Sequence, residues 1–168
     1  MQYYFKKNWK KIALACSIGL LCEGLYVVIQ LVMMREFDAA LSLDLRGFLL
    51  WTAVNLGLYT LYLALAALEG VLEARAIRDM NNQVRRDLYL SLLDKPHADY
   101  HSRDTGEYIS WLTTNVKQME HLAWAPFFSC VQQAGLVVFC ILALVSLHWL
   151  MLAAGLVSAA VMLVVPKV

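Results

Sequence analysis

Three stretches of the sequence carry almost no charge, and they constrain the fold more than any other feature. Residues 12–34 contain one acidic or basic side chain, Glu23, and residues 47–68 contain none. Residues 121–166 are 46 positions without Lys, Arg, Asp or Glu. A helix needs about 20 mostly apolar residues to cross the hydrocarbon core of a bilayer. The sequence therefore predicts an all-α membrane protein, which agrees with its hydrophobic fraction of 61%.

The third stretch is long enough for two crossings. At about 1.5 Å per residue its helix would measure about 70 Å, about twice the hydrocarbon thickness. We therefore predict two spans in it, at 124–144 and 149–165, joined by a tight turn at 146–148. Together with spans at 12–34 and 47–68, the chain is expected to cross the membrane four times.

The positions of Lys and Arg predict the orientation. Four Lys precede the first span, two Arg lie in the expected loop 34–47, and seven basic residues lie in 74–117. Loops rich in Lys and Arg stay in the cytoplasm. We therefore expect a multi-pass protein of the cell membrane with a cytoplasmic N-terminus. The first apolar run is too long for a cleaved signal peptide and is expected to remain as a span.

The second predicted span continues as a helix beyond the membrane. Apolar residues recur every three or four positions with no proline before Pro96, so one helix is expected from about residue 47 to residue 94. Its apolar stripe needs a partner, and residues 115–124 are expected to run beside it. The stripe consists of Ile77, Met80, Val84, Leu88 and Leu92.

A short amphipathic helix is expected between these two stalks, over residues 105–114. Asp104 and Glu107 have the spacing of an N-terminal capping pair. Three large side chains fall on one face of this helix, and a fourth lies beside them. This face lies far from the membrane spans, so we expect a docked partner protein to bury it. The alternative is that it folds back on the stalks or lies on the membrane. The three side chains on this face are Tyr108, Trp111 and Leu112, and the side chain beside them is Ile109.

The segment VRRDLYLSLLDKPHADYHSRDTGEYISWLTTNV, residues 84–116, resembles the first intracellular loop of type I, six-span ABC exporters. Its first part is similar to that family's pattern L-R-x-x-L-F-x-x-L-L-x-x-P, and Thr105, Gly106, Glu107 and Ser110 match the start of the coupling helix. Residues 146–167 are similar to the fourth span. The chain departs from the pattern at Asn115, where the family has an acidic residue, and at Tyr100–His101, where it has an aromatic residue and Asp.

The resemblance implies a fold of four transmembrane helices with long cytoplasmic extensions and a coupling helix, as part of a six-helix transmembrane domain. It implies that the chain is a fragment or a truncated form of a longer protein. The coupling helix would contact the ATPase domain through Thr105, Gly106, Glu107, Tyr108, Ile109, Trp111 and Leu112.

The resemblance also implies the partners. These are the lipid bilayer, nucleotide-binding domains, a second transmembrane domain in a homo- or heterodimer, and the transported substrate. The phosphate-binding pattern G-x-x-x-x-G-K-[ST] does not occur in this sequence. ATP and Mg would therefore be bound by the nucleotide-binding domain, and this chain is expected to supply no catalytic residue and no cofactor.

Polar side chains inside the predicted spans are candidates for a substrate pathway. A carboxylate at the centre of a span costs about 2.5 to 3.5 kcal/mol to insert, so Glu23 is expected to face the bundle or a cavity. The alternative makes Glu23 a protonated hydrogen-bond partner of an amide on another helix. The candidates for the substrate pathway are Glu23, Tyr26, Gln30, Asn55, Gln132 and Gln133.

Other classes of function have less support. A net charge of +1 without a basic face argues against nucleic-acid binding. Four Cys without metal-binding spacing are expected to be small buried apolar residues, with no metal site. The alternative function is a stand-alone four-span membrane protein that binds or regulates a partner. A second long loop, two more spans and a Walker-type lysine downstream would favour the exporter.

Overall fold

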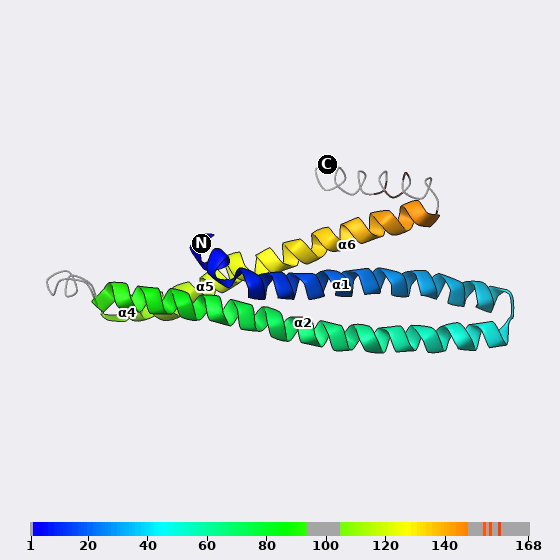
Figure 1. The fold of residues 1–168 in the computed structure, drawn as a ribbon, viewed down its shortest axis with the longest axis horizontal. Helices are drawn as coiled ribbons and strands as arrows, with labels where there is room; N and C mark the ends of the chain where they lie inside the picture. The colour runs from blue at the N-terminus through cyan, green and yellow to red at the C-terminus, as the bar shows by residue number, and fades with distance from the viewer. Residues whose placement is uncertain (1, 94–104, 148–152, 154, 156–157, 159–168) are drawn as a thin grey trace. The chain divides into compact units, whose positions relative to one another are not determined.

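The computed structural model describes residues 2–93 and 105–147, together with positions 153, 155 and 158. The described chain is helical except for the turn at 42–44, which confirms the all-α class. Its elements are α1 (Gln2–Leu41), α2 (Leu45–Leu93), α4 (Thr105–Ser110), η1 (Trp111–Asn115), α5 (Val116–Met119), η2 (Glu120–Trp124) and α6 (Ala125–Leu147), where η1 and η2 are π-helical (Figure 1).

Three helical stretches have the length and composition to cross a membrane, which supports a membrane protein. They are Tyr3–Leu41, Leu45–Leu93 and Tyr108–Leu147. The predicted span 124–144 falls within the third stretch. Of the turn predicted at 146–148, Ser146 and Leu147 are helical, and residue 148 lies outside the described residues. The predicted fourth span, 149–165, lies outside the described residues apart from the three isolated positions.

The long helix predicted for residues 47–94 is confirmed, because α2 runs without interruption from Leu45 to Leu93. Most of the predicted loop 34–47 is helical. Helix α1 continues to Leu41, and three residues complete the connection. The turn is closed by Ser42 Oγ, which donates to the Asp38 carbonyl at 2.9 Å, and by Leu43 in the left-handed region at φ 58°. Local hydrogen bonds therefore replace a longer loop.

The helix predicted to begin at Thr105 does begin there, but its predicted end at residue 114 is wrong. Helical structure continues through η1, α5 and η2 into α6. No Gly or Pro follows residue 114 until Pro126, so no local signal stops the helix. Pro126 is the second residue of α6, and a proline is tolerated in the first turn of a helix because its missing N–H would have no partner there.

The chain divides into two compact units. The first unit comprises Met1–Gly19 and Leu65–Gln132. Within it, the second half of α2 lies beside α4 and α5 (Figure 1). The predicted pairing of the α2 stripe with residues 115–124 is confirmed, because both segments contribute to one buried cluster. The cluster contains Ile12, Ala15, Ala76, Ile77, Met80, Val84, Val116, Trp124 and Phe128, with Leu88 packed against it.

The second unit comprises Leu20–Ala64 and Gln133–Val168. Here α1 and α2 run antiparallel on either side of their short turn (Figure 1). Glycines allow α6 to approach α1: the ring of Phe139 lies 3.4 Å from where a Cβ of Gly24 would be, and Leu20 lies against Gly135. Close approach at small residues is typical of helix packing in membranes.

Candidate functional site

The candidate coupling segment consists of α4 and η1, and its apolar side chains do not all face outward. Tyr108 is 4% exposed, whereas Ile109 is 57% exposed. Trp111 and Leu112 are half-buried, and Gly106 is exposed. The side chains of Thr105 and Glu107, and the whole of Asp104, lie outside the described part of the structure. Ile109 is therefore the most accessible large apolar residue of the segment.

The aromatic part of this face belongs to the chain's own packing. The rings of Tyr108 and Trp111 meet edge to face, with centroids 5.5 Å apart. Tyr108 is therefore covered by the chain itself and does not present its ring on the surface. Helical spacing predicted which side chains share a face, but not how that face is turned.

One hydrogen bond attaches η1 directly to α2. Arg85 Nε donates to the carbonyl oxygen of Leu112 at 3.2 Å. Within the segment, Thr113 Oγ1 donates to the carbonyl of Ile109 at 2.7 Å. An Arg guanidinium carries several donors in a rigid plane, so it orients the backbone that it contacts. The start of the helix is thereby held against the end of α2.

A buried polar network makes a second attachment, between α2 and η2. Trp124 Nε1 donates to Asn81 Oδ1 at 3.1 Å, and Asn81 Nδ2 donates to Glu120 Oε2 at 2.8 Å. Asn81 and Trp124 are both buried. A satisfied buried network gives a preferred arrangement to the elements that it joins. Sequence reasoning missed Asn81, which has no spacing signal of its own.

A groove of about 590 Å³ runs along α2 in the same unit. Its lining combines cationic, anionic and amide side chains with Ile77, and contains no pairing of nucleophile and base. The groove therefore presents a mixed polar surface. It is lined by Gly70, Glu73, Ala74, Ile77, Arg78, Asn81, Asn82, Arg85 and Glu120.

Gln132, a candidate pathway residue, contacts two carboxylates of α2. Its Nε2 donates to Glu69 Oε1 at 2.6 Å and lies 3.5 Å from Glu73 Oε2. The Glu69 carboxylate also lies against Gly19, where a Cβ would collide with it. Gln132 is therefore an interhelical hydrogen-bond donor. Sequence reasoning missed the two glutamates, although their i, i+4 spacing directly after a charge-free span was a signal.

The other candidate pathway residues lie in the second unit. Asn55 is buried, and its Nδ2 donates to Glu36 Oε2 at 3.0 Å, while Thr52 donates to Glu36 Oε1 at 2.7 Å. Asn55 is thus an interhelical hydrogen-bond donor to Glu36, which sequence reasoning did not single out. Asn55 Oδ1 has no partner among the described residues.

Tyr26 packs its ring against Tyr62, with centroids 5.9 Å apart. Glu23 and Gln30 are half-buried, and Gln133 is exposed. The structure therefore brings together Asn55 with Glu36 and Tyr26 with Tyr62, rather than all the candidates around one point.

The cysteines divide by burial. Cys22 is buried and Cys16 half-buried, whereas Cys130 and Cys140 on α6 are exposed. The expectation of four buried Cys is therefore wrong for the two on α6. In the described part of the chain, no three His, Cys, Asp or Glu side chains are close enough to hold a metal ion.

No protein-family model matches the chain. A comparison with curated proteins gives no match either.

Proposed function

We propose that this chain is the transmembrane part of an ATP-driven ABC exporter, and that α4 and η1 transmit the movement of nucleotide-binding domains to the membrane helices. The observation that supports it is the unbroken course of α2, from Leu45 to Leu93. At about 1.5 Å per residue, such a helix is about 70 Å long, against a hydrocarbon core of about 30 Å. About half of it projects beyond the membrane.

The packing of the first unit supports a lever. The projecting half of α2 is held along its length by the buried cluster around Met80 and Trp124, by the Asn81 network and by the bond from Arg85 to Leu112. Force applied at α4 would therefore move α2 and the α4–α6 helix together. Rigid movement of packed helices is a common way to switch a transporter between its inward-open and outward-open states.

The remaining parts of the proposal follow from the exporter assignment. Nucleotide-binding domains supply ATP and Mg, a second transmembrane domain completes a dimer, and two further helices complete the six-helix domain. The N-terminus and the stalks lie in the cytoplasm. Glu23, Tyr26, Gln30, Asn55, Gln132 and Gln133 are the candidates that line the substrate pathway.

The test uses the complete gene product, purified with its ATPase domains in lipid nanodiscs. Ile109→Asp places a charge on the exposed position of the coupling segment, and we expect it to reduce the ATPase rate at least tenfold while helical content is retained. The matched control is Leu122→Asp, because Leu122 is 79% exposed on η2 outside that segment. Its ATPase rate should change less than twofold.

Two results would overturn the proposal. A complete protein that neither contains nor co-purifies with an ATPase would favour the stand-alone four-span protein that binds or regulates a partner. Equal ATPase rates for Ile109→Asp and the unchanged protein would remove α4 from the coupling path.

A further inference from the structure

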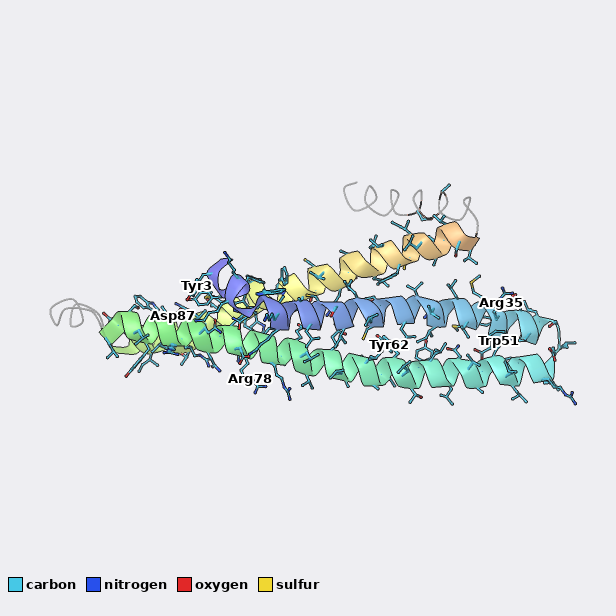
Figure 2. The ribbon with its side chains drawn as sticks, viewed as in Figure 1. Tyr3, Arg35, Trp51, Tyr62, Arg78 and Asp87 are labelled. Carbon is cyan, nitrogen blue, oxygen red and sulfur yellow. The ribbon has the colours of Figure 1, made fainter. Side chains whose placement is uncertain are left out.

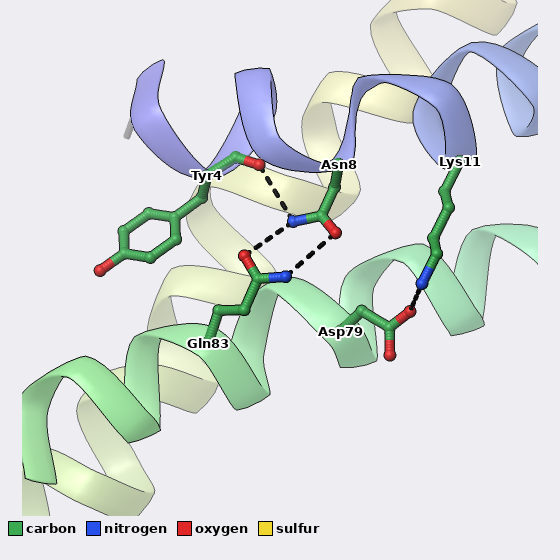
Figure 3. Close-up of polar contacts among 5 residues, drawn as sticks. All are labelled: Tyr4, Asn8, Lys11, Asp79 and Gln83. Atoms are coloured by element: carbon green, nitrogen blue, oxygen red, sulfur yellow. Dashed lines mark hydrogen bonds and ion pairs between the residues drawn. The ribbon is translucent and has the colours of Figure 1, made fainter.

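The first turns of α1 present one face to α2. The Tyr4 hydroxyl donates to a carboxylate of α2 at 3.0 Å, and the side-chain amides of Asn8 and Gln83 exchange two hydrogen bonds of 2.9 and 3.1 Å. Lys11 forms an ion pair one turn further on, as Figure 3 shows. The partners are Tyr4 with Asp87, Asn8 with Gln83 and Lys11 with Asp79.

A second face of the same turns enters the aromatic part of the core. The Phe5 ring packs edge to face on Trp124, with centroids 5.2 Å apart, and on Phe127 at 4.8 Å. Ile12 is buried in the cluster below it. These two sets of contacts determine the rotation of α1 about its axis.

The rest of the circumference is exposed, and we call it the basic arc: Tyr3, Lys6, Lys7, Trp9 and Lys10. With 3.6 residues per turn, these five positions occupy one continuous arc of about 160°. Tyr3 and Trp9 are 63% and 60% exposed, and Figure 2 shows Tyr3 at this end of α1. The Lys7 ammonium lies 5.6 Å from the centroid of the Tyr3 ring. No carboxylate lies on the arc.

We propose that the basic arc binds the headgroups of anionic phospholipids. Three ammonium groups complement the negative charge of such headgroups, and Tyr and Trp rings prefer the boundary between headgroups and acyl chains. The arc directly precedes the apolar stretch 12–34, so insertion of that stretch would bring the arc next to one surface of the membrane. This proposal rests on membrane insertion and not on the exporter assignment.

The continuation of the arc favours a lipid over a nucleic acid or an acidic protein. One turn after Lys10 the exposed positions become apolar, at Ala13 and at Leu14, which is 50% exposed. A phospholipid has the same order of chemistry, with a charged headgroup followed by an acyl chain. Lysine side chains can keep their ammonium at the headgroups while their methylene groups lie along apolar surface.

The test measures quenching of Trp fluorescence in the full chain, reconstituted in vesicles that contain brominated phosphatidylglycerol or brominated phosphatidylcholine. The difference from a Trp9→Phe variant isolates the signal of Trp9. We expect brominated phosphatidylglycerol to quench Trp9 more strongly than brominated phosphatidylcholine does, which would show a preference for the anionic lipid. Lys10→Gln should reduce that preference about fivefold, because a basic side chain near an anionic surface contributes about that factor. Changing Lys6, Lys7 and Lys10 together should abolish it.

Lys11→Gln is the matched control, since it is the neighbouring residue and loses the same charge. Its ammonium is paired with Asp79, so the lipid preference should fall less than twofold. Equal effects of Lys10→Gln and Lys11→Gln would overturn the proposal, because net charge alone would then explain the preference. Equal quenching by the two lipids would overturn it as well. The single variants retain the aromatic contacts of Phe5, so the comparison stands even if the triple variant does not fold.

Discussion

The two units of this chain bury their apolar residues in different ways. The first unit packs Trp124, Phe128 and Met80 into a core with almost no exposed surface. The second unit buries Val27 and Ile29 but leaves most of its large apolar side chains exposed, with Leu41, Leu43, Leu45, Leu49 and Leu56 all more than half accessible. The first pattern is that of a closed apolar core, and the second is that of helices solvated by lipid.

The difference teaches where the stability of each unit comes from. In the first unit, removal of apolar surface from water drives the packing. In the second unit, lipid solvates the outer side chains as well as another helix would, so close packing at Gly24 and Gly135 and hydrogen bonds such as that of Asn55 must hold the helices. Four predictions test this contrast, from the largest expected effect to the smallest.

Trp124→Ala should destabilise the first unit by about 3 to 5 kcal/mol, because it leaves a large cavity in the core. The measurement is the rate at which a thiol reagent labels Cys16 as the denaturant concentration is raised. It uses a variant in which the other three Cys are replaced. Leu56→Ala in the second unit is the comparison, and its effect should stay within about 0.5 kcal/mol because Leu56 is exposed. Equal effects of the two changes would contradict the contrast.

Asn81→Leu should destabilise the first unit by about 1 to 3 kcal/mol, since it leaves Trp124 Nε1 and a Glu120 oxygen without their partner in a buried place. The same Cys16 labelling assay measures it. Asn82→Leu makes the identical change at the exposed neighbouring residue and should have little effect. If both variants behaved alike, the buried network would carry no special stability.

Asn55→Leu should change the stability of the second unit by only about 0.6 kcal/mol, the average for interhelical hydrogen bonds in a membrane protein. It removes the bond to Glu36 but also removes Asn55 Oδ1, which lacks a partner among the described residues. Labelling at Cys22, buried in the second unit, reports the change. A loss above about 2 kcal/mol would show that the second unit depends on polar contacts as strongly as the first.

Separating Lys11 from Asp79 should cost the least, about 0.5 kcal/mol, because the side chains are 60% and 37% exposed and solvent screens their attraction. A double-mutant cycle of Lys11→Gln and Asp79→Asn isolates the coupling energy. Because exposed pairs are screened by salt, the coupling should shrink further when ionic strength is raised. A coupling of several kcal/mol, insensitive to salt, would contradict this assignment.

Local sequence patterns were enough to predict the long elements. The charge-free run 47–68 and the stripe from Ile77 to Leu92 predicted α2 to within two residues at each end, and residues 115–124 were identified as the partner of that stripe. The patterns failed where a helix had to stop. Neither the end of α1 at Leu41 nor the continuation past residue 114 follows from spacing, because both depend on hydrogen bonds that form only in the folded turn or helix.

By itself, the sequence determined the class of this protein and which residues form long helices, because hydropathy and helical periodicity act over neighbouring residues. Only the tertiary structure decided which polar groups meet: Gln132 with Glu69, Asn55 with Glu36, and Asn81 with Trp124. It also turned Tyr108 inward and left Ile109 exposed. These outcomes depend on the register and rotation of one helix against another, which are set by packing between residues far apart in the chain.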